Sequence, residues 1–82
     1  MGRFKNMEIG VKDKIGNELK EGGVIVIREA GFDEEYGYIE YSDKTAEFFA
    51  VFKDGEKIEK VPISEIAGMV VQTASIYDVP QH

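Results

Sequence analysis

The sequence predicts a single domain of the all-β class, and three observations lead to this prediction. The chain has 82 residues, which suits one domain with a small core. Residues 24–27 are all β-branched, as in a strand that is covered on both faces. Asp54-Gly55, which stands between two further strand-like segments, is a dipeptide typical of two-residue type I′ β-hairpin turns.

The elements are expected in the following order. Residues 1–21 mix charged residues with glycines and show no sustained period of two or 3.6, so we expect an extended N-terminal arm that ends in a turn. Residues 62–66 begin with proline and are too few for a regular α-helix, which favours one 3₁₀ turn that ends at Gly68. The expected strands are residues 24–28, 36–41, 46–53, 56–61 and, in two parts, 69–72 and 75–77.

Five short strands with one 3₁₀ turn before the last are typical of a small SH3-like five-stranded barrel. We therefore expect an extended arm at residues 1–21 and a single β-barrel domain at residues 22–80. An OB-like barrel is the main alternative. That fold usually carries a helix between its third and fourth strands, where this chain has Asp54-Gly55.

Alternation of side chains predicts which residues share a face of the sheet. If Ile39 points inward, Tyr36 and Tyr38 lie together on the outer face. In the next strand, Phe48, Ala50 and Phe52 lie on one face, and Phe49 and Val51 lie on the other. The outer face is then apolar and needs a cover, which the N-terminal arm, a second subunit or a protein partner would supply. The residues expected in the core are Val24, Val26, Ile39, Phe48, Phe52, Ile58, Ile66 and Val70.

Composition favours a cytoplasmic protein. The chain has no cysteine, which excludes disulfides and thiolate metal sites and suits a reducing compartment. No apolar run approaches the roughly 18 residues of a membrane span, and the first residues lack the apolar region of a secretory signal. The net charge of -6 disfavours non-specific binding to nucleic acid, although residues 1–20 carry five basic and three acidic residues.

Two parts of the chain carry a family resemblance. The first reads Gly-Val-Lys-Asp-Lys-Ile-Gly-Asn-Glu-Leu-Lys-Glu-Gly at residues 10–22, and the second reads Pro-Ile-Ser-Glu-Ile at 62–66 and Ser-Ile-Tyr-Asp-Val-Pro at 75–80. In order and approximate spacing they resemble segments of the YopX-like proteins of phages and prophages of Gram-positive bacteria. The chain departs from that family at Gly23, where aspartate is usual, and at residues 73–75, where Ile-Gly-Asn is usual. The resemblance implies a phage or prophage origin and a β-barrel-like fold, and it implies no activity.

Few residues suggest catalysis or metal binding. Asp33, Glu34 and Glu35, with Asp43 near them, offer the oxygen ligands that calcium prefers, but their spacing matches no EF-hand loop and a solvated acidic loop is the preferred interpretation. His82 is the only histidine and stands at the end of the chain, which argues against a Ser-His-acid triad. We therefore expect no catalytic residue, no metal and no cofactor.

The outer aromatic residues supply the leading functional hypothesis, which is a non-catalytic phage or prophage accessory protein that binds a protein partner or itself. The candidate interaction surface is Tyr36, Tyr38, Phe49 and Val51. A barrel has one interior, whereas two of the strands are apolar on both faces, so we expect a homodimer or larger assembly with Phe49 and Val51 at its contact.

Two alternatives to this hypothesis remain open. A nucleic-acid-binding barrel is one, because small β-barrels often bind nucleic acids. An acidic decoy of nucleic acid that inhibits a host protein is the other, because the total charge of -6 includes +2 from residues 1–20 and leaves -8 for the rest.

Overall fold

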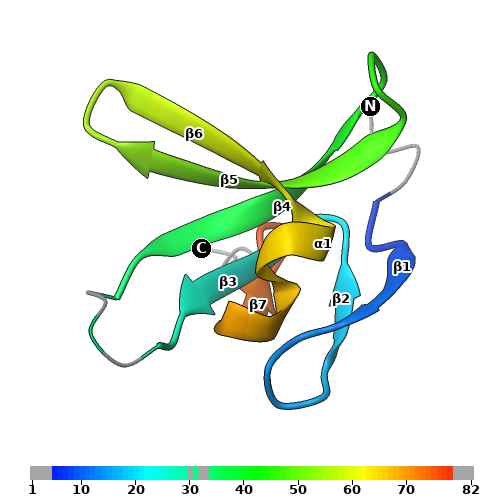
Figure 1. The fold of residues 1–82 in the computed structure, drawn as a ribbon. Helices are drawn as coiled ribbons and strands as arrows, with labels where there is room; N and C mark the ends of the chain where they lie inside the picture. Colours follow the sequence, from blue (N-terminus) through cyan, green and yellow to red (C-terminus); the bar gives the residue numbers. More distant parts are fainter. Residues whose placement is uncertain (1–4, 30, 32–33, 79–82) are drawn as a thin grey trace.

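The computed structural model describes residues 5–29, 31 and 34–78, and over these residues the protein is mostly β (Figure 1). The strands are short, and a single helical segment precedes the last of them. In chain order the elements are β1 Glu8–Lys12, β2 Glu18–Lys20, β3 Gly23–Ile27, β4 Tyr36–Ser42, β5 Glu47–Asp54, β6 Lys57–Pro62, helix α1 Ile63–Ile66, the 3₁₀ turn η1 Ala67–Met69, and β7 Val70–Ser75.

The strands form two antiparallel sheets. Five of them are hydrogen-bonded in the order β6-β5-β4-β3-β7, and β1 pairs with β2 in a separate two-stranded sheet. In Figure 1 the β5–β6 hairpin extends to one side, whereas α1, β1 and β2 gather on the other. The predicted all-β class is confirmed. The sheets do not close into a barrel, because β6 and β7 lie at opposite edges, so the SH3-like barrel is not confirmed.

The N-terminal segment contains two strands that the sequence analysis did not predict. Leu19 in β2 has no exposed surface and belongs to the core, and Ile9 and Val11 of β1 pack against that core. The alternation was hard to recognise because β2 has only three residues and β1 is irregular. Its pairing register shifts within Glu8–Lys12, where Gly10 takes a φ of 79°.

The turn between β5 and β6 lies one residue later than predicted. Asp54 and Lys57 are paired across the hairpin, so the two turn residues are Gly55 and Glu56 rather than Asp54 and Gly55. Gly55 has a φ of 64°, and Glu56 is not among the residues with positive φ. A glycine at the first turn position alone is typical of type II′, which corrects the predicted type I′ turn.

The predicted single 3₁₀ turn is instead one turn of α-helix followed by a 3₁₀ turn. Helix α1 begins after Pro62 and buries Ile63 and Ile66, and η1 then buries Ala67. Gly68 lies inside η1 instead of ending the segment. Burial of these apolar side chains against the sheet stabilises a helix that would be too short to form alone.

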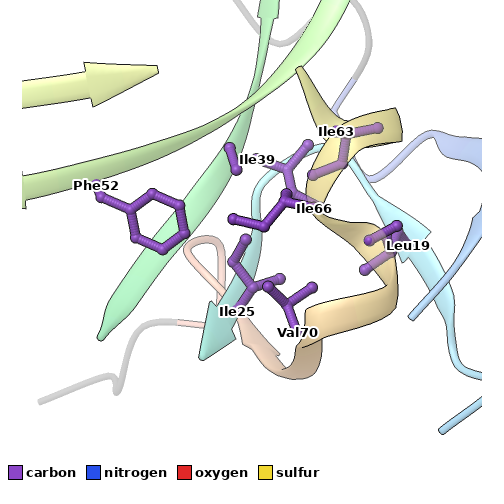
Figure 2. Close-up of a cluster of buried hydrophobic side chains, with 9 residues drawn as sticks. Leu19, Ile25, Ile39, Phe52, Ile63, Ile66 and Val70 are labelled. Atoms are coloured by element: carbon purple, nitrogen blue, oxygen red, sulfur yellow. The ribbon is translucent and has the colours of Figure 1, made fainter. Parts of the chain in front are cut away.

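One face of the five-stranded sheet carries the hydrophobic core, which α1, η1 and β2 cover. Figure 2 shows Ile25, Ile39 and Phe52 of the sheet on one side of Ile66 of α1, and Leu19 of β2 belongs to the same cluster. Burial of apolar surface is the main force that holds these layers together. The cluster consists of Leu19, Ile25, Ile39, Ala50, Phe52, Ile63, Ile66, Ala67 and Val70.

The predicted core is right in five positions and differs in three. Val26, Ile39, Phe52, Ile66 and Val70 are buried, which confirms those predictions. Three residues are not fully covered: Val24 and Phe48 are half-buried and Ile58 is 58% exposed.

The phase of β3 was also predicted wrongly. Ile25 belongs to the core cluster, whereas Val26 pairs with Tyr36 on the opposite face of the sheet. Every residue from Val24 to Ile27 is apolar, so the alternation of this strand could not indicate its phase.

Candidate functional site

The candidate surface lies on the face of the sheet opposite the core, which we call the second face. Tyr38 is paired with Val24 of β3 on one side and with Val51 of β5 on the other. Residues directly opposite each other across a ladder point to the same side of the sheet. Tyr36 and Phe49 lie two residues away along their strands and therefore share this face, as the alternation predicted.

A shallow hollow of about 190 Å³ lies in the second face, and we call it the tyrosine depression. Val51 is only 1% exposed and forms its floor, whereas Tyr36 at 57% and Ile76 at 41% are exposed at its rim. Three of the four predicted surface residues therefore come together here, and Phe49 does not line it. The full lining is Val24, Tyr36, Gly37, Tyr38, Val51, Lys53 and Ile76.

Ile76 and Val24 are the members of this surface that sequence reasoning missed. Val24 was assigned to the core because its strand is apolar throughout. Ile76 follows β7, which pairs with β3, and its backbone N–H donates to the carbonyl of Gly22 at 2.7 Å. Only this long-range pairing carries Ile76 to the depression, and no local pattern could have indicated it.

Charged side chains stand beside the depression on the second face. The Tyr38 hydroxyl donates to Glu40 Oε1 at 3.4 Å, and Lys60 Nζ lies 3.3 Å from Glu40 Oε2. Burial raises the pKa of Tyr38 above its ordinary value of 10.0, and the charge and hydrogen bond of Glu40 raise it further, while Lys60 lowers it. The phenol is therefore neutral at physiological pH and serves as a hydrogen-bond donor. The surface as a whole offers apolar contact with a polar border.

A buried carboxylate at the other side of the molecule has a structural role. Asp13 Oδ1 accepts hydrogen bonds from the backbone N–H of Asn17 at 2.7 Å and of Ile15 at 3.0 Å. Asp13 Oδ2 accepts from Gln72 N at 2.8 Å and from Asn17 Nδ2 at 3.1 Å. Burial by itself raises the pKa of Asp13, but these hydrogen bonds outweigh it and hold the pKa below its ordinary value of 3.8.

Gln72 continues the same connection between β7 and the N-terminal hairpin. Its side-chain Oε1 accepts from Lys20 N, and its Nε2 donates to the carbonyl of Glu18, both at 3.0 Å. The side-chain amide of Gln72 thus makes two backbone hydrogen bonds with β2 of the kind that a neighbouring strand would make. Gly23 makes room for it, because a Cβ at that position would lie 2.1 Å from Gln72 Oε1. A polar hollow of about 640 Å³ lies here, and the amide that borders it is already engaged in these bonds.

Replacement of Asp13 by alanine is expected to lower the free energy of unfolding by about 2–3 kcal/mol at neutral pH, because buried backbone donors lose a charged acceptor. The folded-state pKa lies below 3.8, so this contribution is present above that pH and is lost as the pH falls through the folded-state pKa. Urea unfolding of the two proteins at decreasing pH should show a shrinking difference. The exposed Asp43 provides the control, since Asp43→Ala should change little at any pH; a pH-independent difference for Asp13→Ala would contradict the assignment.

The two segments that carry the family resemblance meet in space. The Tyr77 hydroxyl donates to Glu21 Oε1 at 2.7 Å, and this hydrogen bond raises the pKa of the phenol, with smaller effects from burial and from the charge of Glu21. Gly22 lies under the Tyr77 ring, where a Cβ would be 2.4 Å from Cε2. Lys5 Nζ stands 4.7 Å from the centroid of the ring. These contacts tie the N-terminal segment to the end of β7.

The acidic residues considered for a cation site are not gathered in the described residues. Glu34 pairs with Arg28 at 3.4 Å, Glu35 and Asp43 are exposed, and Asp33 and His82 lie outside the described residues. Across residues 5–29, 31 and 34–78, no group of three or more histidine, aspartate or glutamate side chains is placed to hold a metal ion. None of the helices in the same residues has the length and apolar character needed to cross a membrane.

Comparison of the chain with models of protein families, with curated proteins and with solved structures finds no match.

Proposed function

We propose that this protein is a non-catalytic binding module and that it holds a protein partner in the tyrosine depression. The proposal rests on one observation: the tyrosine depression has a buried aliphatic floor, Val51, and exposed Tyr36 and Ile76 at its rim. Exposed tyrosine and isoleucine side chains around a depression are unfavourable in water and are typical of contact residues in protein interfaces.

The chemistry of the depression indicates what kind of partner it suits. Its floor and walls would receive an apolar side chain, while the Lys53 ammonium and the Tyr36 hydroxyl would meet polar groups of the partner. Tyrosine is a frequent energetic centre of interfaces, because it buries a large area at a small entropic cost and retains a hydrogen-bonding group. A peptide segment with one or two large apolar residues next to a carboxylate fits these features.

Peptide selection tests the proposal without knowledge of the natural partner. Peptides selected from a random library on the immobilised protein should be rich in large apolar residues, and their binding should shift the amide resonances of Tyr36, Tyr38 and Ile76. Tyr36→Glu should reduce their affinity at least tenfold while leaving the melting temperature close to that of the parent. Ile15→Glu, at an exposed isoleucine of the β1–β2 turn, is the matched control and should keep full affinity.

Two outcomes would contradict this function. One is that selected peptides bind Tyr36→Glu as well as they bind the parent. The other is that DNA or RNA probes bind tightly and in a salt-sensitive manner, which would favour the nucleic-acid-binding alternative.

We further propose that the protein is a YopX-like accessory protein of a phage or prophage, located in the cytoplasm of the host, and that its sheet is related to SH3-like folds. The resemblance of residues 10–22, 62–66 and 75–80 supports the family. The order of elements supports the fold, since β3 to β6 form a meander, a helical turn follows, and β7 returns to pair with β3. The genes that flank the coding sequence test the origin, and a setting free of phage genes would count against it.

A further inference from the structure

β6 is an edge strand of the five-stranded sheet and stands open to solvent. Its first four residues are all exposed, and Ile58 among them is 58% exposed. An edge strand presents a row of backbone N–H and C=O groups to any strand that can pair with it. Figure 1 shows the turn end of this hairpin extending away from α1 and from the N-terminal sheet, and the exposure of residues 57–60 shows that this part of the edge is accessible.

The register of the hairpin shows which backbone groups of β6 face outward. Lys57 is paired with Asp54 at the two ends of the two-residue turn, where the C=O of the first residue accepts the N–H of the last. Hydrogen-bonded and outward-facing residues then alternate along the strand, so Ile58 and Lys60 direct their backbone groups to the open edge. Pro62 has the same outward phase and no N–H, and it ends the edge.

The charges along this edge are complementary to themselves. The sequence from residue 56 reads Glu-Lys-Ile-Glu-Lys. When two such strands run antiparallel with Ile58 opposite Ile58, Lys57 lies opposite Glu59 of the other copy, and Glu56 lies opposite Lys60. Opposite charges at facing positions stabilise a strand pair, and the central isoleucines bury each other.

We propose that two copies of this protein associate through their β6 strands, antiparallel and centred on Ile58, so that the two five-stranded sheets become one. Symmetric registers centred on Lys57, Glu59 or Lys60 are disfavoured, because each would place two like charges on the two-fold axis. Within the described part of the chain, Lys57 and Glu59 take part in no ion pair, so both are available.

The association also places the second faces of both copies on one side. The two-fold axis of a continuous antiparallel sheet is perpendicular to it, so equivalent residues of the two copies lie on the same side of the sheet. Ile58 is paired with Lys53, which lines the tyrosine depression. If the proposed function holds, the dimer carries two binding depressions side by side and gains affinity for a partner with two matching segments.

Charge reversal and mixing test the β6 pairing directly. At high concentration and low salt, sedimentation of the full chain should give a mass close to twice that of the monomer, and added salt should lower it. Lys57→Glu alone and Glu59→Lys alone should each remain monomeric, because each places like charges opposite each other. An equimolar mixture of the two variants should recover the dimer, since the carboxylate introduced in one variant then faces the ammonium introduced in the other.

Glu47→Lys, an equivalent reversal at the exposed start of β5, is the control and should dimerise like the parent. A monomeric parent at every concentration, single variants that dimerise normally, or a mixture that stays monomeric would each overturn the proposal. Loss of the dimer in Tyr36→Glu with no effect of the β6 variants would also overturn it, because the copies would then meet through the second face. Loss of peptide binding with an intact β6 dimer would refute only the proposed function.

Discussion

Replacement of Phe52 by alanine is expected to lower the free energy of unfolding by about 3–5 kcal/mol, the range for large-to-small changes at buried aromatic residues. The Phe52 side chain is buried in the core, and its ring lies over Gly37 of β4, to which it is paired. A Cβ at Gly37 would come within 2.7 Å of the ring, so the two residues fit closely. Alanine would leave a cavity between β4 and β5 that neither strand could fill.

The measurement is urea unfolding followed by circular dichroism. Small domains have stabilities of about 5 kcal/mol, so the Phe52→Ala protein should be close to unfolded at 37 °C. Phe49→Ala is the matched control, because Phe49 is on the same strand, half-buried and on the second face. If both variants lost the same stability, the assignment of the core to one face of the sheet would be wrong.

Replacement of Leu19 by alanine is expected to cost about 2–5 kcal/mol, although β2 lies outside the five-stranded sheet. Leu19 has no exposed surface and packs in the core cluster with residues of the sheet and of α1. An extended arm that merely rests on a domain would tolerate this change. A large loss would therefore show that the N-terminal hairpin folds together with the sheet.

Ile15→Ala in the same hairpin separates the loss of buried packing from the removal of an exposed apolar side chain. Ile15 is 67% exposed in the turn between β1 and β2, so its removal should change stability by less than about 0.5 kcal/mol. Equal effects of Leu19→Ala and Ile15→Ala on the urea midpoint would contradict the structural role of Leu19. A two-step unfolding curve for the parent would indicate that the hairpin and the sheet unfold separately.

The candidate site was predicted only in part, and the reason differs between its residues. Tyr36 and Tyr38 could be placed together from alternation alone, because Ile39 is flanked by residues of a clear strand. The burial of Val51 could not be predicted from alternation, because it depends on the residues of β3 and β4 beside it. The position of Ile76 depends on the pairing of β7 with β3, which joins segments about fifty residues apart along the chain.

The surface for self-association also could not be predicted from local sequence patterns alone. The doubly apolar strands led to an expected contact through Phe49 and Val51, but Val51 is buried within the chain. The self-complementary order of charges at residues 56–60 was present in the sequence. Its significance became visible only when the sheet order placed β6 at an edge.

The sequence by itself determined the all-β class, the approximate positions of the five strands of the main sheet and the face shared by Tyr36 and Tyr38. Strand formation, tight turns and alternation are local properties of the chain, so a local pattern can indicate them. Tertiary structure alone decided the phase of β3, the incorporation of Leu19 into the core, the buried Asp13–Gln72 connection and the placement of β6 and β7 at opposite edges of the main sheet. Each of these depends on which distant segments share a hydrogen-bond ladder or an apolar face. In an apolar run such as residues 24–27, either set of alternate side chains could face the core. The segments that pack against the strand determine which set does so.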